Sequence, residues 1–343
     1  MGERRLKGRY ELQAVLGRGL ATDTHLALDH ETGERCVVKV LSLASADALK
    51  AHELLMREAR VLQRLEHPRI PRLVDFFTEE DGPDTRVCLV QQHVEGKSLY
   101  ELVRAGRRFS ESEAIALGVK LARVLEYLHG FSPPILHRDL KPANVLVTPG
   151  ERVYLVDFGA VRDHVPHEML HPSGPTIVGT RGYMPIEQFE GHAVPGSDLY
   201  SLGATLVFAL SGKEPAELRK QGLQLDFEPH VSVSAPFARL LARLLEPDWR
   251  ERPLSASEVR EALERIAEQA KRPRPGPRPT KPWLIALVAL VAVAGLGNLL
   301  AQLATAAAPA CGAAGRGRPN RGRYRGSHDT PVRVASVDGD AAR

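Results

Sequence analysis

The feature that most constrains this chain is a charged loop followed by a short apolar hairpin. The loop reads HRDLKPAN over residues 137–144. Two apolar runs follow and flank Pro149 and Gly150, a pattern that predicts a β-hairpin. Asp157 comes directly after the second run. Because a hairpin brings the chain back to where it started, we expect Asp157 to lie beside Asn144.

The side chains brought together in this way suit one kind of chemistry. Phosphoryl transfer from ATP needs a carboxylate to orient the attacking hydroxyl, oxygen ligands for a magnesium ion, and cations against the phosphates. Asp139 can supply the carboxylate, and Asn144 and Asp157 can supply metal ligands. Lys141 can supply one of the cations. The pattern therefore indicates a phosphotransferase that uses ATP with Mg²⁺ or Mn²⁺.

Charge is distributed unevenly along the chain. The whole sequence of 343 residues has a formal charge of +4, but from Lys271 onward there are 12 Lys and Arg against three Asp. The remaining 34 basic and 39 acidic residues make the body mildly acidic. A basic tail on an acidic body is typical of a membrane flank or a solvated tail, and we expect no nucleic-acid partner. The three cysteines are far apart and show no metal-binding spacing.

Apolar periodicity divides the body into a part rich in strands and a part rich in helices. The first part is predicted to hold short antiparallel strands at 12–16, 24–28, 36–41, 74–77 and 87–90, with one helix at 49–65. The second part is predicted to hold helices at 110–128, 198–210, 236–245 and 257–270. The first of these begins with a capping box formed by Ser110 and Glu113. We therefore expect an α+β fold with a small sheet lobe before a larger, mainly helical lobe.

The order H-R-D-L-x-x-x-N and then D-F-G resembles the eukaryotic-like serine/threonine protein kinases of bacteria, which share this pattern. The resemblance covers residues 10–267. It implies a two-lobed protein kinase fold and transfer of the γ-phosphate of ATP to serine or threonine hydroxyls of proteins, including autophosphorylation. Lys141 and Thr180 resemble the serine/threonine class more than the tyrosine class.

The resemblance also implies roles for residues outside the loop. Lys39 matches the strand lysine that contacts the α- and β-phosphates, and Glu58 matches its ion-pair partner. With Asp139 and Lys141 these form the catalytic set. The residues implied to hold the nucleotide are Leu16, Gly17, Gly19, Thr24, Val37, Lys39, Gln92 and Val94.

Further along the chain, the resemblance implies regulation and substrate positioning. Residues 179–187 match the segment that positions a peptide substrate, and Asp198, Gly203 and Arg252 match structural anchors of the helical lobe. Because Arg138 precedes the catalytic aspartate, a phosphate in the activation loop is expected to pair with it. The candidate acceptors are Ser173, Thr176 and Thr180.

Several positions depart from the family pattern, and most lie where the nucleotide would bind. They are Thr22 and Thr24 in the glycine-rich loop, Val37 before the strand lysine, Gln91 and Gln92 in the hinge, and Pro185 and Ile186 near the peptide groove. One alternative is therefore a pseudokinase that acts as a signalling scaffold. A second is a kinase-fold enzyme that acts on a small molecule, although such enzymes lack the peptide-positioning segment.

The ends of the chain have different compositions. Residues 1–9 are predicted to be an N-terminal extension, and 268–282 form a basic, proline-rich linker. The apolar run at 283–303 has the length of a single transmembrane helix, and 304–343 form a Gly- and Arg-rich tail expected to be disordered. We therefore expect a single-pass protein of the cell membrane with its kinase domain in the cytoplasm. Asn298 and Gln302 share one helix face and suggest a homodimer.

Overall fold

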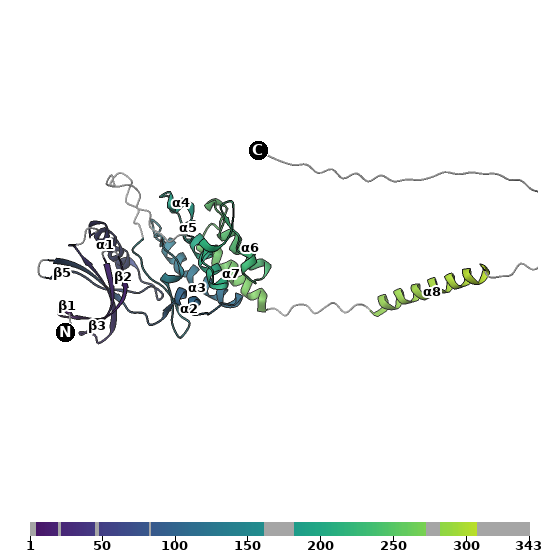
Figure 1. Cartoon of the computed structure of the whole chain (residues 1–343), viewed down its shortest axis with the longest axis horizontal. Helices are drawn as coiled ribbons and strands as arrows, with labels where there is room; N and C mark the ends of the chain where they lie inside the picture. The colour runs from purple at the N-terminus through teal and green to yellow at the C-terminus, as the bar shows by residue number, and fades with distance from the viewer. Residues whose placement is uncertain are drawn as a thin grey trace, which may run out of the picture. The chain divides into compact units, whose positions relative to one another are not determined.

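The structure is a computed structural model, and it describes residues 5–19, 22–44, 48–81, 84–160, 182–271 and 282–306. The chain divides into two units, 1–273 and 274–343. Figure 1 shows the first unit with strands β1, β2, β3 and β5 and helix α1 on one side and helices α2 to α7 gathered on the other.

A six-stranded antiparallel sheet forms the first half of this unit, with the strand order β1-β2-β3-β4-β6-β5. Its strands are β1 (Arg5–Leu6), β2 (Tyr10–Arg18), β3 (Thr22–Asp29), β4 (Arg35–Ser42), β5 (Leu73–Asp81) and β6 (Asp84–Gln92). Helix α1 (Ala48–Arg64) contacts β4, β5 and β6. The arrangement matches the expected small sheet with one helix, and β1 adds a strand from the region predicted as an extension.

Both faces of the sheet are covered, and alternation along β4 determines which side chains reach which face. Cys36 and Val38 pack in one apolar cluster, whereas Leu41 packs in the main core with residues of α1. Because successive side chains of a strand point to opposite faces, Lys39 shares the face of Leu41. The strand lysine is thereby turned toward α1.

The second half of the unit is mainly helical. Its helices are α2 (Leu99–Arg104), α3 (Glu111–His129), α4 (Ile186–Phe189), α5 (Pro195–Ser211), α6 (Ala235–Leu244) and α7 (Ala256–Lys271). Short strands are β7 (Lys97–Ser98), β8 (Val145–Val147), β9 (Val153–Leu155), β10 (Lys220–Gln221) and β11 (Gln224–Leu225), and 3₁₀ turns are η1 (Pro142–Asn144), η3 (Pro215–Glu217), η4 (Glu228–His230) and η5 (Trp249–Glu251). Helix α3 packs against both α5 and α7.

Local sequence signals account for the start of α3 and for the hairpin. Ser110 accepts from the backbone N–H of Glu113, and the Glu113 carboxylate accepts from the backbone N–H of Ser110, so the predicted capping box is present. Strands β8 and β9 pair in the register Val145 with Leu155. The hairpin is therefore formed as predicted.

The second unit contains helix α8 (Pro282–Ala306), which includes the residues predicted to span a membrane. Leu290, Val293 and Leu296 on this helix are largely exposed. In the part of the chain that the structure describes, however, no helix is found that is long and apolar enough to cross a membrane.

Candidate active site

Lys39 is held in the centre of the first unit by two carboxylates. Its Nζ donates to both oxygens of Glu58, at 2.7 and 2.8 Å, and to Oδ1 of Asp157 at 2.8 Å. The Lys39 side chain is 13% exposed and that of Glu58 is 3% exposed. Burial alone would lower the pKa of Lys39, but the two carboxylates raise it above its usual value, so the amine is charged. The predicted ion pair between β4 and α1 is formed.

Asp157 connects this pair to the loop region beyond β9. The ammonium group of Lys39 lowers the pKa of Asp157 from 3.8 to about 2, against the opposing effect of burial. Its backbone adopts a left-handed conformation with φ of 67°, which aspartate tolerates better than most residues. Its side chain remains 44% exposed, which is more than those of its two partners. Asp157 is thus ionised and accessible from a pocket.

The catalytic-loop residues gather around the carboxylate of Asp139. Lys141 Nζ lies 2.7 Å from Oδ2 of Asp139. The side-chain amide of Asn144 donates to the carbonyl oxygen of Asp139 at 2.8 Å and to Oδ2 at 3.0 Å. The backbone N–H of Val156 donates to the carbonyl of Asn144 at 2.9 Å. The hairpin therefore brings the residue before Asp157 into contact with Asn144, as the sequence predicted.

Asp198 of α5 holds the backbone of the catalytic loop. Its carboxylate accepts from the backbone N–H groups of His137 at 3.0 Å and Arg138 at 2.9 Å, and it lies 2.9 Å from the ring of His129. Burial would raise the pKa of Asp198, but the hydrogen bond from His129 and the adjacent charges and N–H groups lower it. The anchor predicted for Asp198 is therefore a direct contact.

His137 and Arg138 occupy different settings in this loop. His137 is fully buried, its ring packs edge-on against Phe158 at 4.9 Å, and burial lowers its pKa. Arg138 adopts a left-handed backbone with φ of 64°. Its carbonyl accepts from the side-chain amide of Gln188 at 2.6 Å. His137 thus supports the loop by packing.

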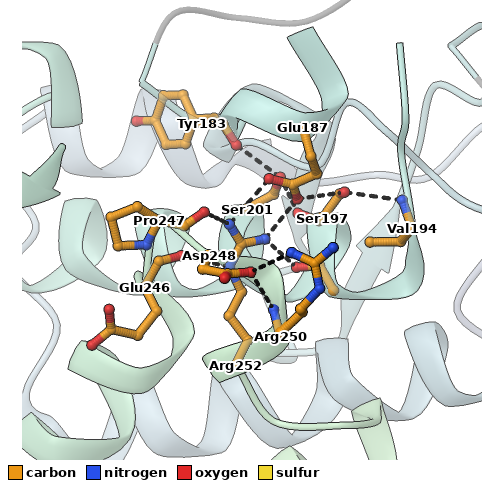
Figure 2. Close-up of polar contacts among 11 residues, drawn as sticks. Tyr183, Glu187, Val194, Ser197, Ser201, Glu246, Pro247, Asp248, Arg250 and Arg252 are labelled. Carbon is orange, nitrogen blue, oxygen red and sulfur yellow. Dashed lines mark hydrogen bonds and ion pairs between the residues drawn. The ribbon is translucent and has the colours of Figure 1, made fainter. Parts of the chain in front are cut away.

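A second buried ion pair joins α4 to the turn before α7 (Figure 2). Arg252 donates to the two carboxylate oxygens of Glu187 at 2.7 and 3.2 Å. Its other donors reach the carbonyl oxygens of Gly196, Glu246 and Pro247. Arg252 is therefore a structural anchor, as the resemblance implies, and it also connects two segments of backbone, at Gly196 and at Glu246 with Pro247.

The match to known proteins decides the family. Residues 10–264 match the protein kinase domain family. The chain belongs to the protein kinase family. Serine/threonine-protein kinase B of Synechocystis sp. is 36% identical over 275 residues, which cover 76% of this chain and 47% of that protein.

Two further relatives carry the same kind of name. Serine/threonine-protein kinase PknA of Nostoc sp. is 35% identical over 276 residues, covering 76% of this chain and 48% of the relative. Serine/threonine-protein kinase PknA of Mycobacterium tuberculosis is 34% identical over 214 residues, covering 61% of this chain and 48% of the relative. This chain spans about half the length of these curated kinases.

The nucleotide side of the kinase domain includes a pocket next to Lys39. Its walls are Gly17, Arg18, Gly19, Thr22, Thr24, Lys39, Ala51, Leu54, Leu55, Glu58, Asp157 and Gly159. Four of the predicted nucleotide contacts, Gly17, Gly19, Thr24 and Lys39, are therefore together. This pocket combines glycine backbone, a buried lysine and an ionised aspartate, which suits the phosphate end of a nucleotide.

The other predicted nucleotide contacts lie apart from that pocket. Leu16 of β2 is 53% exposed, and Val37 of β4 is half-buried. Gln92 and Val94, at and after the end of β6, line a separate hollow with residues of the β8–β9 turn. The structure thus brings the phosphate-side residues together and leaves the adenine-side assignments as predictions.

The donor set of this kinase domain fits a divalent cation bound together with phosphates. The Asn144 side chain directs its nitrogen to Asp139, so its Oδ1 is the atom that would ligate a metal. Asp157 is ionised and has a second carboxylate oxygen beyond the one that meets Lys39. Among the described residues there is no group of three or more His, Cys, Asp or Glu that would hold a metal alone. One carboxylate and one amide suit Mg²⁺, which keeps water and phosphate ligands.

Some supporting residues of this site had no signal in the sequence. Ser197 donates to Glu187 at 2.7 Å, and Ser201 donates to the carbonyl of Tyr183 at 2.8 Å, so α5 holds the segment before α4 (Figure 2). Tyr183 donates to Glu214 at 2.7 Å, and Arg104 pairs with the same carboxylate at 3.1 Å. Serine and glutamate at such positions cannot be told from surface residues without the fold.

The predicted acceptors Ser173, Thr176 and Thr180 lie outside the described residues.

Proposed function

We propose that this protein is a serine/threonine kinase that transfers the γ-phosphate of ATP to hydroxyl groups of protein substrates and of itself. The observation that carries the proposal is the joined set of Lys39, Glu58 and Asp157 next to a pocket walled by Gly17 and Gly19. Phosphoryl transfer relies on positioning and on charge stabilisation, and these residues are already positioned by the protein alone.

The catalytic loop supplies the remaining groups. The Asp139 carboxylate is oriented by Asn144 and Lys141, and it can accept a hydrogen bond from a substrate hydroxyl. The charge of Lys141 lies 2.7 Å from that carboxylate, where it can also face a transferring phosphoryl group. The backbone of the loop is held by Asp198, whose carboxylate accepts from two of its N–H groups. A fixed base beside a fixed cation favours direct transfer to a hydroxyl group.

ATP would supply the phosphoryl group, and Mg²⁺ or Mn²⁺ bound with it would offset the negative charge of the phosphates. Asn144 and Asp157 would hold the metal, and Lys39 would hold the phosphates. The choice of serine or threonine as acceptor is supported by Lys141 and by the names of the relatives. Protein substrates are supported by the ordered contacts of Tyr183 and Glu187 in the substrate-positioning segment.

The second candidate function is a pseudokinase scaffold, and Thr22 is the observation that favours it. This threonine replaces the third glycine of the phosphate loop and lines the pocket. Against it stands the complete set of charged groups that the reaction requires. None of these groups is replaced in the chain.

The test of the proposal is phosphate transfer by the full-length protein. Purified wild-type chain and Asp139→Asn are incubated with labelled MgATP and a generic basic protein, and the labelled residues are identified. We expect phosphoserine and phosphothreonine with wild type, and a loss of label of about 10³-fold in the variant. A wild-type protein that is folded, binds ATP and incorporates no label would support the scaffold instead.

We also propose that residues 283–303 attach the protein to the cell membrane, with the kinase domain in the cytoplasm. The support is an uncharged apolar run of the required length, next to a basic linker. No membrane-crossing helix is found among the described residues, so this proposal rests on the sequence. Asn298 and Gln302 would favour a homodimer through this segment.

The attachment can be tested in cells that produce the full-length chain. We expect wild type to sediment with membranes and to resist extraction by high salt. Replacing both Leu290 and Val293 by lysine should release it to the soluble fraction, because a charge at the centre of a bilayer is unfavourable. Wild type in the soluble fraction would contradict the proposal.

A further inference from the structure

The strand that leaves the phosphate loop places two threonines over the pocket. In the pairing of β3 with β4, Thr24 lies opposite Lys39, and Thr22 lies opposite Leu41. Directly paired residues, and residues two apart on one strand, share a face of the sheet. Thr22 and Thr24 therefore share the face on which Lys39 meets Glu58 and Asp157. All five of these residues line one cavity.

The backbone of Thr22 is held by a contact with Gly19. The Thr22 carbonyl oxygen accepts from the backbone N–H of Gly19 at 2.8 Å. A Cβ atom at Gly19 would come within 2.9 Å of that same oxygen, so this contact requires glycine at residue 19. With its carbonyl engaged, Thr22 can offer its hydroxyl group to a ligand in the pocket. A glycine at this position would offer no side chain at all.

The wall around Thr22 is suited to an anionic ligand that only accepts hydrogen bonds. Thr24 and Lys39 line the same cavity as Thr22, so two hydroxyl-bearing side chains and an ammonium group occur around it. Phosphate oxygens are acceptors, and hydrogen bonds to charged oxygens are stronger than those between neutral groups. The hydroxyl of Thr22 can therefore hold a phosphate oxygen where a third glycine would allow only the backbone to approach it.

We propose that Thr22 is a nucleotide-binding residue whose hydroxyl donates a hydrogen bond to the phosphate chain of ATP. This inference rests on the proposed function, because it assigns a contact within the same nucleotide site. The alternative is a steric effect, in which the threonine methyl group crowds the phosphates. The two explanations predict opposite changes in ATP affinity. If the hydroxyl donates a hydrogen bond, Thr22→Gly weakens ATP binding, and if the methyl group crowds the phosphates, Thr22→Gly strengthens it.

The test measures binding of a fluorescent ATP analogue with Mg²⁺ to the full-length protein, with competition by ATP and by adenosine. Thr22→Val keeps the shape and removes the hydroxyl, and Thr22→Gly restores the family residue. We expect both variants to raise the dissociation constant for ATP about 10- to 100-fold, the size of one hydrogen bond to a charged group. Thr22→Ser should stay within about twofold of wild type, because it keeps the hydroxyl. Adenosine, which lacks phosphates, should bind all four proteins equally.

Thr78→Val on β5 makes the same chemical change at an exposed position outside the cavity, and we expect it to leave ATP binding unchanged. Unchanged ATP binding in Thr22→Val, or tighter binding in Thr22→Gly, would overturn the inference while the kinase proposal stands. An equal loss of ATP and adenosine binding would also overturn it, since the effect would not involve the phosphates. Wild-type protein that binds no nucleotide would overturn the proposed function itself.

Discussion

The kinase domain has two buried ion pairs, each between a basic residue and a glutamate, and the two serve different purposes. Lys39 meets Glu58, and Arg252 meets Glu187, each at 2.7 Å. Arg252 directs its remaining donors to backbone carbonyls, and its side chain is 0% exposed. Lys39 also meets Asp157, which is open to a pocket. A cation satisfied entirely by protein holds the fold together, whereas a cation with an open side can receive a ligand.

The largest expected effect is on stability, at Arg252. Arg252→Met leaves the buried carboxylate of Glu187 uncompensated and frees three backbone carbonyls. We expect the free energy of unfolding to fall by about 3–5 kcal/mol. Urea unfolding of the full-length chain, followed by circular dichroism, measures it. Adding Glu187→Leu to the variant should recover part of the loss, and a single-variant loss below about 1 kcal/mol would contradict a structural role.

Next in size is the effect on phosphate transfer at Lys39. Lys39→Met removes the cation that faces the pocket, so we expect kcat/KM for ATP to fall about 10²- to 10³-fold, as when one preorganised charge is removed from an active site. Lys39→Met leaves the buried carboxylate of Glu58 without its partner, but the loss of stability should still be smaller than for Arg252→Met, because no backbone carbonyl is freed and Asp157 can be solvated by water. Steady-state kinetics and urea unfolding of the same preparations test both. A variant that loses stability as severely as Arg252→Met would remove the distinction between the two pairs.

A smaller effect concerns pH, through Asp157. Its pKa in the folded protein, about 2, is below the value of an unfolded aspartate, so its ion pair with Lys39 stabilises the fold above about pH 5. That stabilisation is lost as the pH falls from about 5 toward 2. We expect Asp157→Asn to be less stable than wild type at about pH 7, and the gap to narrow at about pH 3. A gap that stays constant between these pH values would contradict the assignment.

The smallest effect is expected at a surface pair that serves as a control. Arg243 and Glu258 lie 3.2 Å apart, with side chains that are 52% and 35% exposed. Arg243→Ala should change the free energy of unfolding by less than about 1 kcal/mol, because solvent screens exposed pairs. Thermal and urea unfolding measured beside Arg252→Met would check it. If Arg243→Ala lost as much stability as Arg252→Met, burial would not explain the difference between the exposed and the buried ion pair.

The sequence predicted those parts of the site in which order and spacing determine position. The hairpin of β8 and β9 follows from its apolar runs and turn residues, and it brings the chain before Asp157 back to Asn144. The pair of Lys39 and Glu58 was implied by the resemblance to the kinase family, and the two side chains meet in the structure. The capping box at Ser110 placed the start of α3. For the hairpin and the capping box the signal is local, and each contact lies within one short segment of the chain.

Contacts between distant segments left no comparable signal. The side-chain amide of Gln188 donates to the carbonyl of Arg138. Arg138 has a left-handed backbone conformation, which is uncommon for residues other than glycine and is not indicated by the sequence around it. Ser197 and Ser201 look like ordinary helix residues, yet both bind the substrate-positioning segment. These contacts depend on how helices are packed, which the sequence does not specify locally. Helix α2 was missed for another reason: Ser98 and Glu101 form a capping box like that of α3, but the helix is too short for a periodic signal.

Helix α5 is expected to make the catalytic loop more rigid than the sheet side of the active site. Every residue from Ser197 to Ala209 is buried, and Asp198 of this helix binds the catalytic loop through two backbone N–H groups. In hydrogen exchange, amides of such a helix open only near global unfolding, so those of His137 and Arg138 should exchange with the slowest class although they belong to a loop. Fluctuations that open the small sheet would then change access to the nucleotide pocket while the hydroxyl-orienting loop keeps its shape.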